Sequence, residues 1–323
     1  MAAFTGAFKT YESIGNREDL SDIIYNISPT ETPIVTNIGR TTADATSHEW
    51  QTDALTAATK DNAQFEADDV PSATAATPTV RVKNYCQIMR KDITVSGTQE
   101  RIKKAGRKSE LAYQVAKLGD ELKRDLEAAV SQNNASVAGA AGTARKLGGL
   151  ESWYATNDDR ATAGTPGADG GYNTGTGLTV APTDGTQRAL TEQMLKNVLQ
   201  SIFNNSSASA DMVVAGGFNK QQISTFTGNA TKMKDISDGT LQASVDVYQS
   251  DFGEVSIFPS RFVRTRTVHV LQSDMLAVAY LRPFFMKDLA STGDYERKMM
   301  LLEATLEVRN EKAHGVIADL TTS

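Results

Sequence analysis

One long amphipathic stretch, residues 107–134, constrains the fold more than any other part of the chain. Its apolar residues follow one another at intervals of three or four, and this spacing places them along one face of a helix. They are Leu111, Val115, Leu118, Leu122, Leu126, Ala129 and Val130. At 1.5 Å per residue the helix would be roughly 40 Å long. Since no second helix of that length is available to pair with it, the sequence predicts an elongated or flattened molecule.

Composition limits the classes of protein to which the chain can belong. The chain has 323 residues, enough for one large domain or two smaller ones, and a formal charge of −6. That mild acidity disfavours a dedicated nucleic-acid binder. The lone cysteine, Cys86, cannot form an internal disulfide, and we expect it to be a buried apolar residue in a strand. No signal peptide or membrane span is recognisable, so a cytosolic chain without a membrane partner is expected.

The first 45 residues predict an extended arm that needs a neighbouring surface. Its scattered apolar residues begin with Phe4, Phe8 and Tyr11. A second group has helical spacing and predicts a short helix at 18–26; it comprises Leu20, Ile23, Ile24 and Tyr25. Pro29 and Pro33 are expected to end that helix and to favour extended chain.

Residues 46–98 predict a long antiparallel finger. Strands are expected at 47–55 and 79–95, joined by a polar loop that carries Glu66, Asp68 and Asp69. These acids have two interpretations, a solvated turn or docking to a basic surface on another copy. A two-stranded ribbon is marginally stable by itself, so the finger should find a partner surface.

A basic segment precedes the long helix, with Lys103, Lys104, Arg107 and Lys108. One interpretation is a solvated helix face. The other is contact with an acidic partner surface or with phosphate.

The next part of the chain, residues 138–185, holds 11 of the 24 glycines. It predicts a long irregular surface excursion held in place by Trp153, and a boundary between two lobes. After it, a helix at 188–203, a short buried strand at 211–215 and a helix after Gly216-Gly217 form an α/β pattern. Further strands are expected at 245–248, 254–259, 267–271 and 275–281.

The last long strand, residues 297–309, alternates cleanly. Met300, Leu302 and Leu306 point to one face, whereas Glu303 and Glu307 point to the other. We expect it to pair with the strand after the finger or to pack on the long helix, which would return the chain end to the N-terminal half.

No catalytic signature accompanies this organisation. His48-Glu49-Trp50-Gln51-Thr52 begins like a zinc-protease helix but lacks the second histidine, and the three histidines are far apart. Phosphate-binding loops and nucleophile elbows do not occur. Acidic pairs such as Asp158-Asp159 lie in loops and predict water-facing turns. We therefore predict no catalytic, cofactor-binding or metal-binding residue. A ligand site at the helix after Gly216-Gly217 is the remaining enzymatic alternative.

Three strings carry a resemblance: His48-Glu49-Trp50-Gln51-Thr52-Asp53, residues 119–127 (GDELKRDLE) and residues 306–315 (LEVRNEKAHG). Together they resemble a phage head-protein family long known as a domain of unknown function. The order of elements also resembles the major capsid protein of tailed bacteriophages, whose Hong Kong 97-type fold is shared with herpesvirus capsid floors and encapsulins.

The resemblance implies an α+β Hong Kong 97-type fold. Its parts would be an N-terminal arm (1–45), an extended β-hairpin loop (46–98), a peripheral lobe with the spine helix (99–185), an axial lobe (186–281) and return strands (282–323).

The implied function is structural. The chain would self-assemble as pentamers and hexamers into an icosahedral or prolate shell around packaged dsDNA, in the host bacterial cytoplasm, without cofactor or enzymatic activity. Implied partners are a portal protein, possible scaffolding and decoration proteins, and DNA contacted non-specifically. An encapsulin-type compartment shell is the alternative.

Candidate inter-subunit contacts gather on the arm, the finger and the basic segment: Phe4, Phe8, Tyr11, Trp50, Lys60, Phe65, Glu66, Asp68, Asp69, Lys103, Lys104, Arg107 and Lys108. Lys60 is a finger lysine, as in the family's cross-linking variant. The asparagine and the catalytic acid of that variant have no match here, so covalent cross-linking is not predicted.

Overall fold

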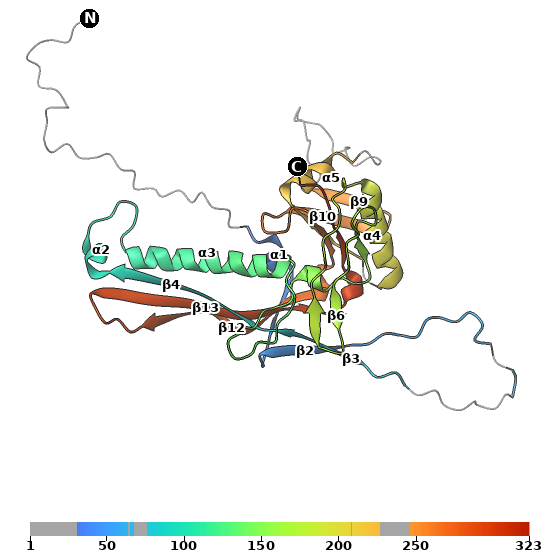
Figure 1. Ribbon diagram of the computed structural model, residues 1–323, viewed down its shortest axis with the longest axis horizontal. Helices are drawn as coiled ribbons and strands as arrows, with labels where there is room; N and C mark the ends of the chain where they lie inside the picture. The colour runs from blue at the N-terminus through green and yellow to red at the C-terminus, as the bar shows by residue number, and fades with distance from the viewer. Residues whose placement is uncertain (1–30, 64, 68–75, 208, 227–245, 323) are drawn as a thin grey trace, which may run out of the picture.

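The computed structural model describes residues 31–63, 65–67, 76–207, 209–226 and 246–322. Within them the molecule is elongated (Figure 1). A long helix and a long narrow sheet extend to one side of a compact body, and a two-stranded finger projects to the other. The helix expected at 18–26 lies outside the described residues.

The long helix is α3, Glu110–Ser131. It is shorter than the expected 107–134 because Ser109 caps it, its hydroxyl accepting a hydrogen bond from the amide of Ala112 at 3.1 Å. The chain just before is bent at Gly106, which has a positive φ of 73°. The expected apolar stripe is confirmed, with Leu118, Leu122 and Leu126 buried.

A four-stranded sheet lies against α3. Its order is β1-β12-β13-β4, with β1 parallel to β12 and the other pairs antiparallel. The strands are β1 (Gly39–Thr42), β4 (Gln87–Ser96), β12 (Leu276–Leu289) and β13 (Tyr295–Val308). Pairing of β13 with β4 confirms that the terminal strand returns to the N-terminal half. β12 runs eight residues beyond the expected end at 281, with register shifts on either side of Arg282.

The finger consists of β2 (Ser47–Thr52) and β3 (Val80–Tyr85), paired from Ser47 with Tyr85 to Thr52 with Val80. The expectation of one continuous strand at 79–95 was wrong. The chain breaks at the buried Cys86, whose amide donates to the carbonyl of Thr46. Before this residue the chain pairs with β2, and after it β4 pairs with β13.

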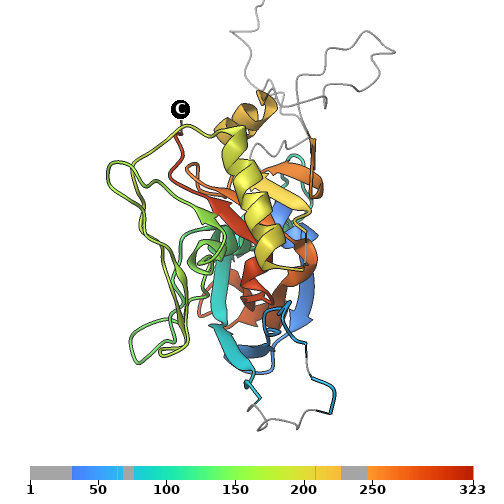
Figure 2. The same cartoon turned by 90° about the vertical axis from the view of Figure 1, so that its right-hand side faces the viewer.

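The body is built on a six-stranded sheet in the order β5-β14-β11-β8-β10-β9. Its strands are β5 (Asp158–Asp159), β8 (Met212–Ala215), β9 (Val247–Ser250), β10 (Gly253–Pro259), β11 (Val268–Leu271) and β14 (Gly315–Ile317). The expected strand at 211–215 is confirmed as β8, which is central and wholly buried and begins one residue later, at Met212. Figure 2 shows α4 (Glu192–Asn205) lying over this sheet. α5 (Gly217–Ser224) follows β8, as the Gly216-Gly217 turn predicts.

The glycine-rich excursion carries little regular structure. It contains a single turn of 3-10 helix (η2, Leu150–Ser152) and a small hairpin of β6 (Gly171–Asn173) and β7 (Leu178–Val180). Trp153 is 3% exposed and packs in the core with Leu147, Leu150 and Tyr154, which confirms that it holds the excursion in place.

Short helical segments complete the fold: α1 (Pro33–Asn37), α2 (Gly97–Arg101), η3 (Ser273–Met275) and η4 (Glu311–Ala313). The expectation that Pro33 favours extended chain was wrong, because Pro33 begins α1. Proline is well tolerated in the first turn of a helix, where its missing N–H has no intrahelical partner. None of the described helices has the length and apolar character needed to cross a membrane.

Candidate assembly surfaces

The tip of the finger is unusually exposed. It is the described part of the loop between β2 and β3, residues 53–63, 65–67 and 76–79. Leu55 is 98% exposed and Phe65 is 86% exposed, although both are large apolar side chains. Lys60 forms an ion pair with the neighbouring Asp61, and Glu66 is exposed. An isolated subunit leaves this surface in water, so its apolar residues are suited to contact with another molecule.

The base of the finger is fixed firmly to the body. The indole Nε1 of Trp50 donates a hydrogen bond to the carbonyl of Val308 at 3.0 Å. Its ring lies 5.6 Å from that of Trp153, which stacks in turn on Tyr172 at 5.6 Å. Trp50 thus contacts its own chain and sets the direction in which the finger leaves the body.

A buried carboxylate reinforces the same base. The Oε2 atom of Glu307 accepts from the hydroxyl of Thr41 at 2.9 Å and lies 3.2 Å from Nε2 of His48. Its Oε1 atom accepts from Arg309 at 3.0 Å. The contact with His48 is the main cause that lowers the pKa of Glu307 to about 2. Strands β1, β2 and β13 therefore meet at one ionised group.

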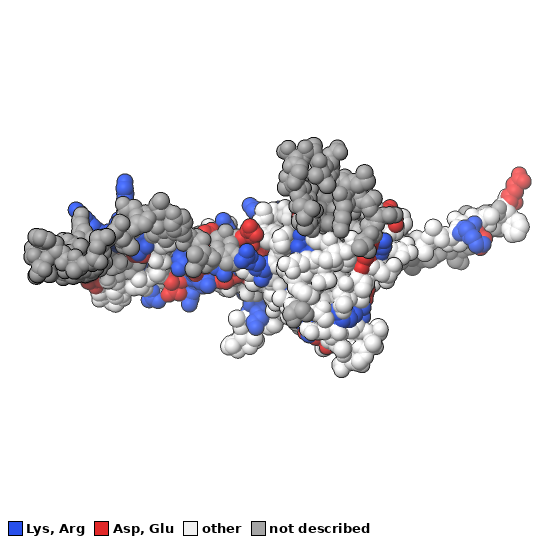
Figure 3. Space-filling view, turned by 90° about the horizontal axis from the view of Figure 1, so that it is seen from above, with Lys and Arg blue, Asp and Glu red and all other residues white. Residues whose placement is uncertain are grey.

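The opposite end of the molecule is basic. We call it the distal end, residues 97–109. Lys104 pairs with Glu100, and Arg107 pairs with Glu110. Lys103 and Lys108 are exposed, and neither has an ion-pair partner within the described part of the chain. Of the four basic candidates, these two therefore carry charge that another molecule can neutralise. Figure 3 shows blue side chains near this end and a red and blue cluster on the finger tip.

An apolar surface that sequence reasoning missed lies on the middle of β12, near residues 120–126 of α3. Phe284, Phe285 and Met286 are 37%, 36% and 48% exposed. Three consecutive large apolar residues followed by Lys287-Asp288 were the available signal, since an ordinary two-faced strand alternates.

The remaining candidates cannot be placed. Phe4, Phe8, Tyr11, Asp68 and Asp69 lie outside the described residues.

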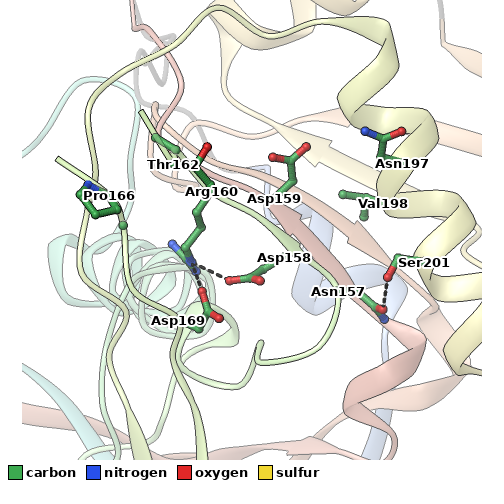
Figure 4. Close-up of a pocket in the computed structure, with 12 residues that line it drawn as sticks. Asn157, Asp158, Asp159, Arg160, Thr162, Pro166, Asp169, Asn197, Val198 and Ser201 are labelled. Atoms are coloured by element: carbon green, nitrogen blue, oxygen red, sulfur yellow. Dashed lines mark hydrogen bonds and ion pairs between the residues drawn. The ribbon is translucent and has the colours of Figure 1, made fainter. Parts of the chain in front are cut away.

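Two features of the body resemble ligand sites, but their polar groups contact other residues of the same chain. In the cavity of Figure 4, Nε of Arg160 lies 2.7 Å from Asp158 and 3.5 Å from Asp169. Burial and the neighbouring Asp169 raise the pKa of Asp158 to about 6. At the first turn of α5, Asn219 donates to the carbonyl of Thr265. No group of three or more His, Cys, Asp or Glu side chains that could hold a metal occurs in the described ranges.

Comparison with known sequences identifies the protein family to which this elongated chain belongs. The sequence profile of the SU10 major capsid protein family matches residues 4–321. The chain belongs to the SU10 major capsid protein family. A curated relative, the major capsid protein of Escherichia phage Phieco32, is 28% identical over 348 aligned positions, covering 96% of both chains. Members of this family are structural components of capsids, so the chain is a capsid protein and not an enzyme.

Solved structures show the same fold at low identity. The capsid of a native GTA particle matches with a TM-score of 0.64 and 11% identity, over 97% of this chain and 98% of that one. The capsid of Cyanophage A-1(L) matches at 0.62 with 13% identity, over 97% and 98%. The SrpI encapsulin of Synechococcus elongatus matches at 0.56 with 11% identity, over 95% and 93%. The Hong Kong 97-type fold expected from the sequence is confirmed.

Proposed function

We propose that this capsid protein assembles as pentamers and hexamers into the closed shell of a tailed bacteriophage, which encloses packaged dsDNA. The family match over residues 4–321 carries the proposal. The surfaces described above explain how a subunit without a catalytic centre performs the task.

The finger tip and the distal end carry side chains of opposite charge. The finger tip presents exposed apolar residues and Glu66, with Asp68 and Asp69 next in the sequence. The distal end presents the exposed bases Lys103 and Lys108. Opposite charges suit contact between copies, because they steer the approach and favour one orientation. We therefore propose that the finger of one subunit docks on the distal end of a neighbour.

The mild net charge of −6 fits a container wall. A strongly basic wall would bind DNA through many phosphates and release it slowly, because such binding gains free energy with each phosphate contact. We accordingly propose weak, non-specific contact with DNA. A portal protein, and scaffolding or decoration proteins encoded separately, would complete the particle in the host cytoplasm.

The encapsulin-type compartment is the second candidate, and it rests on the similarity to SrpI. The curated phage relative favours the viral shell. Particles recovered from infected cells would distinguish the two, because a phage head encloses nuclease-protected dsDNA whereas a compartment encloses protein cargo.

Assembly is tested with purified recombinant chain by negative-stain electron microscopy and light scattering. Closed shells, tubes or five- and six-fold rings are expected. A protein that stays monomeric at high concentration, with and without a scaffold-containing lysate, would overturn the proposal.

A further inference from the structure

A groove of about 680 Å³ lies where the described chain begins. Three elements line it: α3 through Asp120, Lys123 and Leu126, β12 through Tyr280, Pro283 and Phe284, and the α1–β1 segment through Thr32, Val35, Thr36 and Arg40. Its walls combine large apolar side chains with charged groups at the rim, and Phe284 is 37% exposed.

The first residues of the described chain are fixed at the edge of this groove. The backbone amides of Ile34 and Val35 donate to the two carboxylate oxygens of Glu127 on α3, at 3.0 and 2.8 Å. Ile34 is fully buried and Val35 is 7% exposed. Glu127 therefore positions the start of α1, so the chain that precedes Thr32 must begin beside the groove.

The sequence just before that point carries an apolar stripe. Leu20, Ile23, Ile24 and Ile27 recur at helical spacing. Ile27 is five residues from Thr32, and five residues span at most about 17 Å. The stripe is consequently within reach of the groove in its own chain.

The charges are complementary as well. Arg40 and Lys123 are exposed at the rim, and neither has an ion-pair partner within the described ranges. The arm contributes Glu18, Asp19 and Asp22 in the same stretch as the apolar stripe. A segment that presents apolar residues to the walls would bring these acids toward the rim.

We propose that residues 17–30 occupy this groove in their own chain, packing their apolar stripe between the spine helix α3 and strand β12. The arm then leaves the subunit at about residue 16. Only the segment with Phe4, Phe8 and Tyr11 remains to reach a neighbour. This contact lies within one chain and does not depend on shell closure.

Zero-length carbodiimide cross-linking of the unmodified full-length protein tests it. This reagent joins a lysine amine to a carboxylate that is in direct contact. We expect amide links from Lys123 to Glu18, Asp19 or Asp22, at least fivefold more abundant than links from Lys312 to the same acids. Lys312 is the matched control because it is exposed and lines a different groove, beside the finger.

A mixture of ¹⁴N- and ¹⁵N-labelled subunits identifies the source of the arm. Links within one isotope only are expected. Mixed-isotope links would show that the arm of another copy fills the groove and would overturn the proposal, as would equal linking of Lys123 and Lys312.

A cysteine pair gives an independent measurement. Under a mild thiol oxidant, Ile24→Cys with Phe284→Cys should form an intramolecular disulfide at least fivefold faster than Ile24→Cys with Lys312→Cys. The native Cys86 does not interfere, since it is fully buried and burial raises its pKa to about 11. Equal rates in the two pairs would contradict the proposal.

Discussion

The imidazole of His48 and the carboxylate of Glu307 lie 3.2 Å apart, measured from Nε2 to Oε2, although 259 positions separate them in sequence. His48 belongs to finger strand β2, and Glu307 belongs to the central strand β13. The pair therefore joins the projecting finger to the four-stranded sheet and fixes the base of the finger.

Replacing this carboxylate should weaken the folded state. The substitution Glu307→Gln loses the charged acceptor for Thr41, His48 and Arg309, and we expect it to lower the free energy of unfolding by about 1–3 kcal/mol at pH 7. Urea unfolding followed by circular dichroism measures the change.

The same pair predicts a pH dependence. The folded pKa of Glu307, about 2, lies below its usual value of 4.5. Its stabilising contribution is therefore complete above pH 4.5 and is lost as the pH falls toward 2. The difference between wild type and Glu307→Gln should shrink over that interval. A difference that stays constant from pH 7 to pH 2.5 would refute this role.

Glu127 should behave in the opposite sense. Burial raises its pKa despite hydrogen bonds from the amides of Val35 and Ile34. Its contribution is greatest below pH 4.5 and declines as the pH rises through the raised folded pKa. The stability of Glu127→Gln relative to wild type should thus increase as the pH rises above 4.5. Parallel stability curves for the two proteins would show that the carboxyl does not titrate in this range.

Close packing at the C-terminal end of the spine helix predicts a severe effect of Gly149→Ala. An added Cβ would lie 2.3 Å from the carbonyl oxygen of Gln132 and 3.0 Å from that of Ala129. Both atoms are backbone, so the excursion must move away, at a cost of about 1–3 kcal/mol. Gly217→Ala is the control, because nothing lies within 4 Å of its added Cβ. Thermal unfolding should show a lower Tm for the first variant only.

Deletion of residues 57–76 at the finger tip should separate folding from assembly. The strand pairs from Ser47–Tyr85 to Thr52–Val80 lie outside the deletion, so a soluble folded subunit is expected. Electron microscopy should find no closed shells. Normal shells from this variant would sink the assignment of the finger as an inter-subunit element.

Charge reversal tests the partner of the finger. The double variant Lys103→Glu/Lys108→Glu should reduce the yield of shells at least tenfold, and Glu66→Lys in the same chain should restore part of it. Arg261→Glu is a matched exposed change on the body, outside both ends, and should assemble normally. Loss of assembly without any rescue would argue that the distal end meets some other surface.

Elements with a strong local pattern could be predicted from the sequence. The local residue pattern was enough to predict three elements: the apolar stripe of α3, the wholly apolar β8 and the alternating β13. The sequence left two partners open for β13, the strand after the finger or the long helix, and the structure pairs it with β4.

The structure differs from the sequence-based expectations where contacts with residues distant in the sequence determine the local backbone conformation. Nothing local marks the break at Cys86, because strand-forming residues continue on both sides while the partner strand changes from β2 to β13. The helical start at Pro33 depends on Glu127, which lies more than ninety positions away. β12 continues past Pro283 because the register shift beside Arg282 accommodates a residue without an N–H.

The assembly surfaces could be predicted only in part from the sequence. Exposure of Phe65 and Lys103 follows from their polar surroundings in the sequence. The internal pairing of Lys104 and Arg107 depends on carboxylates placed by α2 and by the cap of α3, so composition alone overstated the free charge at the distal end.

The passage of the chain from β3 through Cys86 into β4 has a mechanical consequence. A pull on the finger along its length is transmitted directly into β4, an edge strand that lies alongside β13 through ten residue pairs. Such a load is shared by the whole ladder in shear, and its hydrogen bonds must fail together instead of opening one after another from an end. A shell under internal pressure would then be held by the strongest loading geometry that a sheet offers.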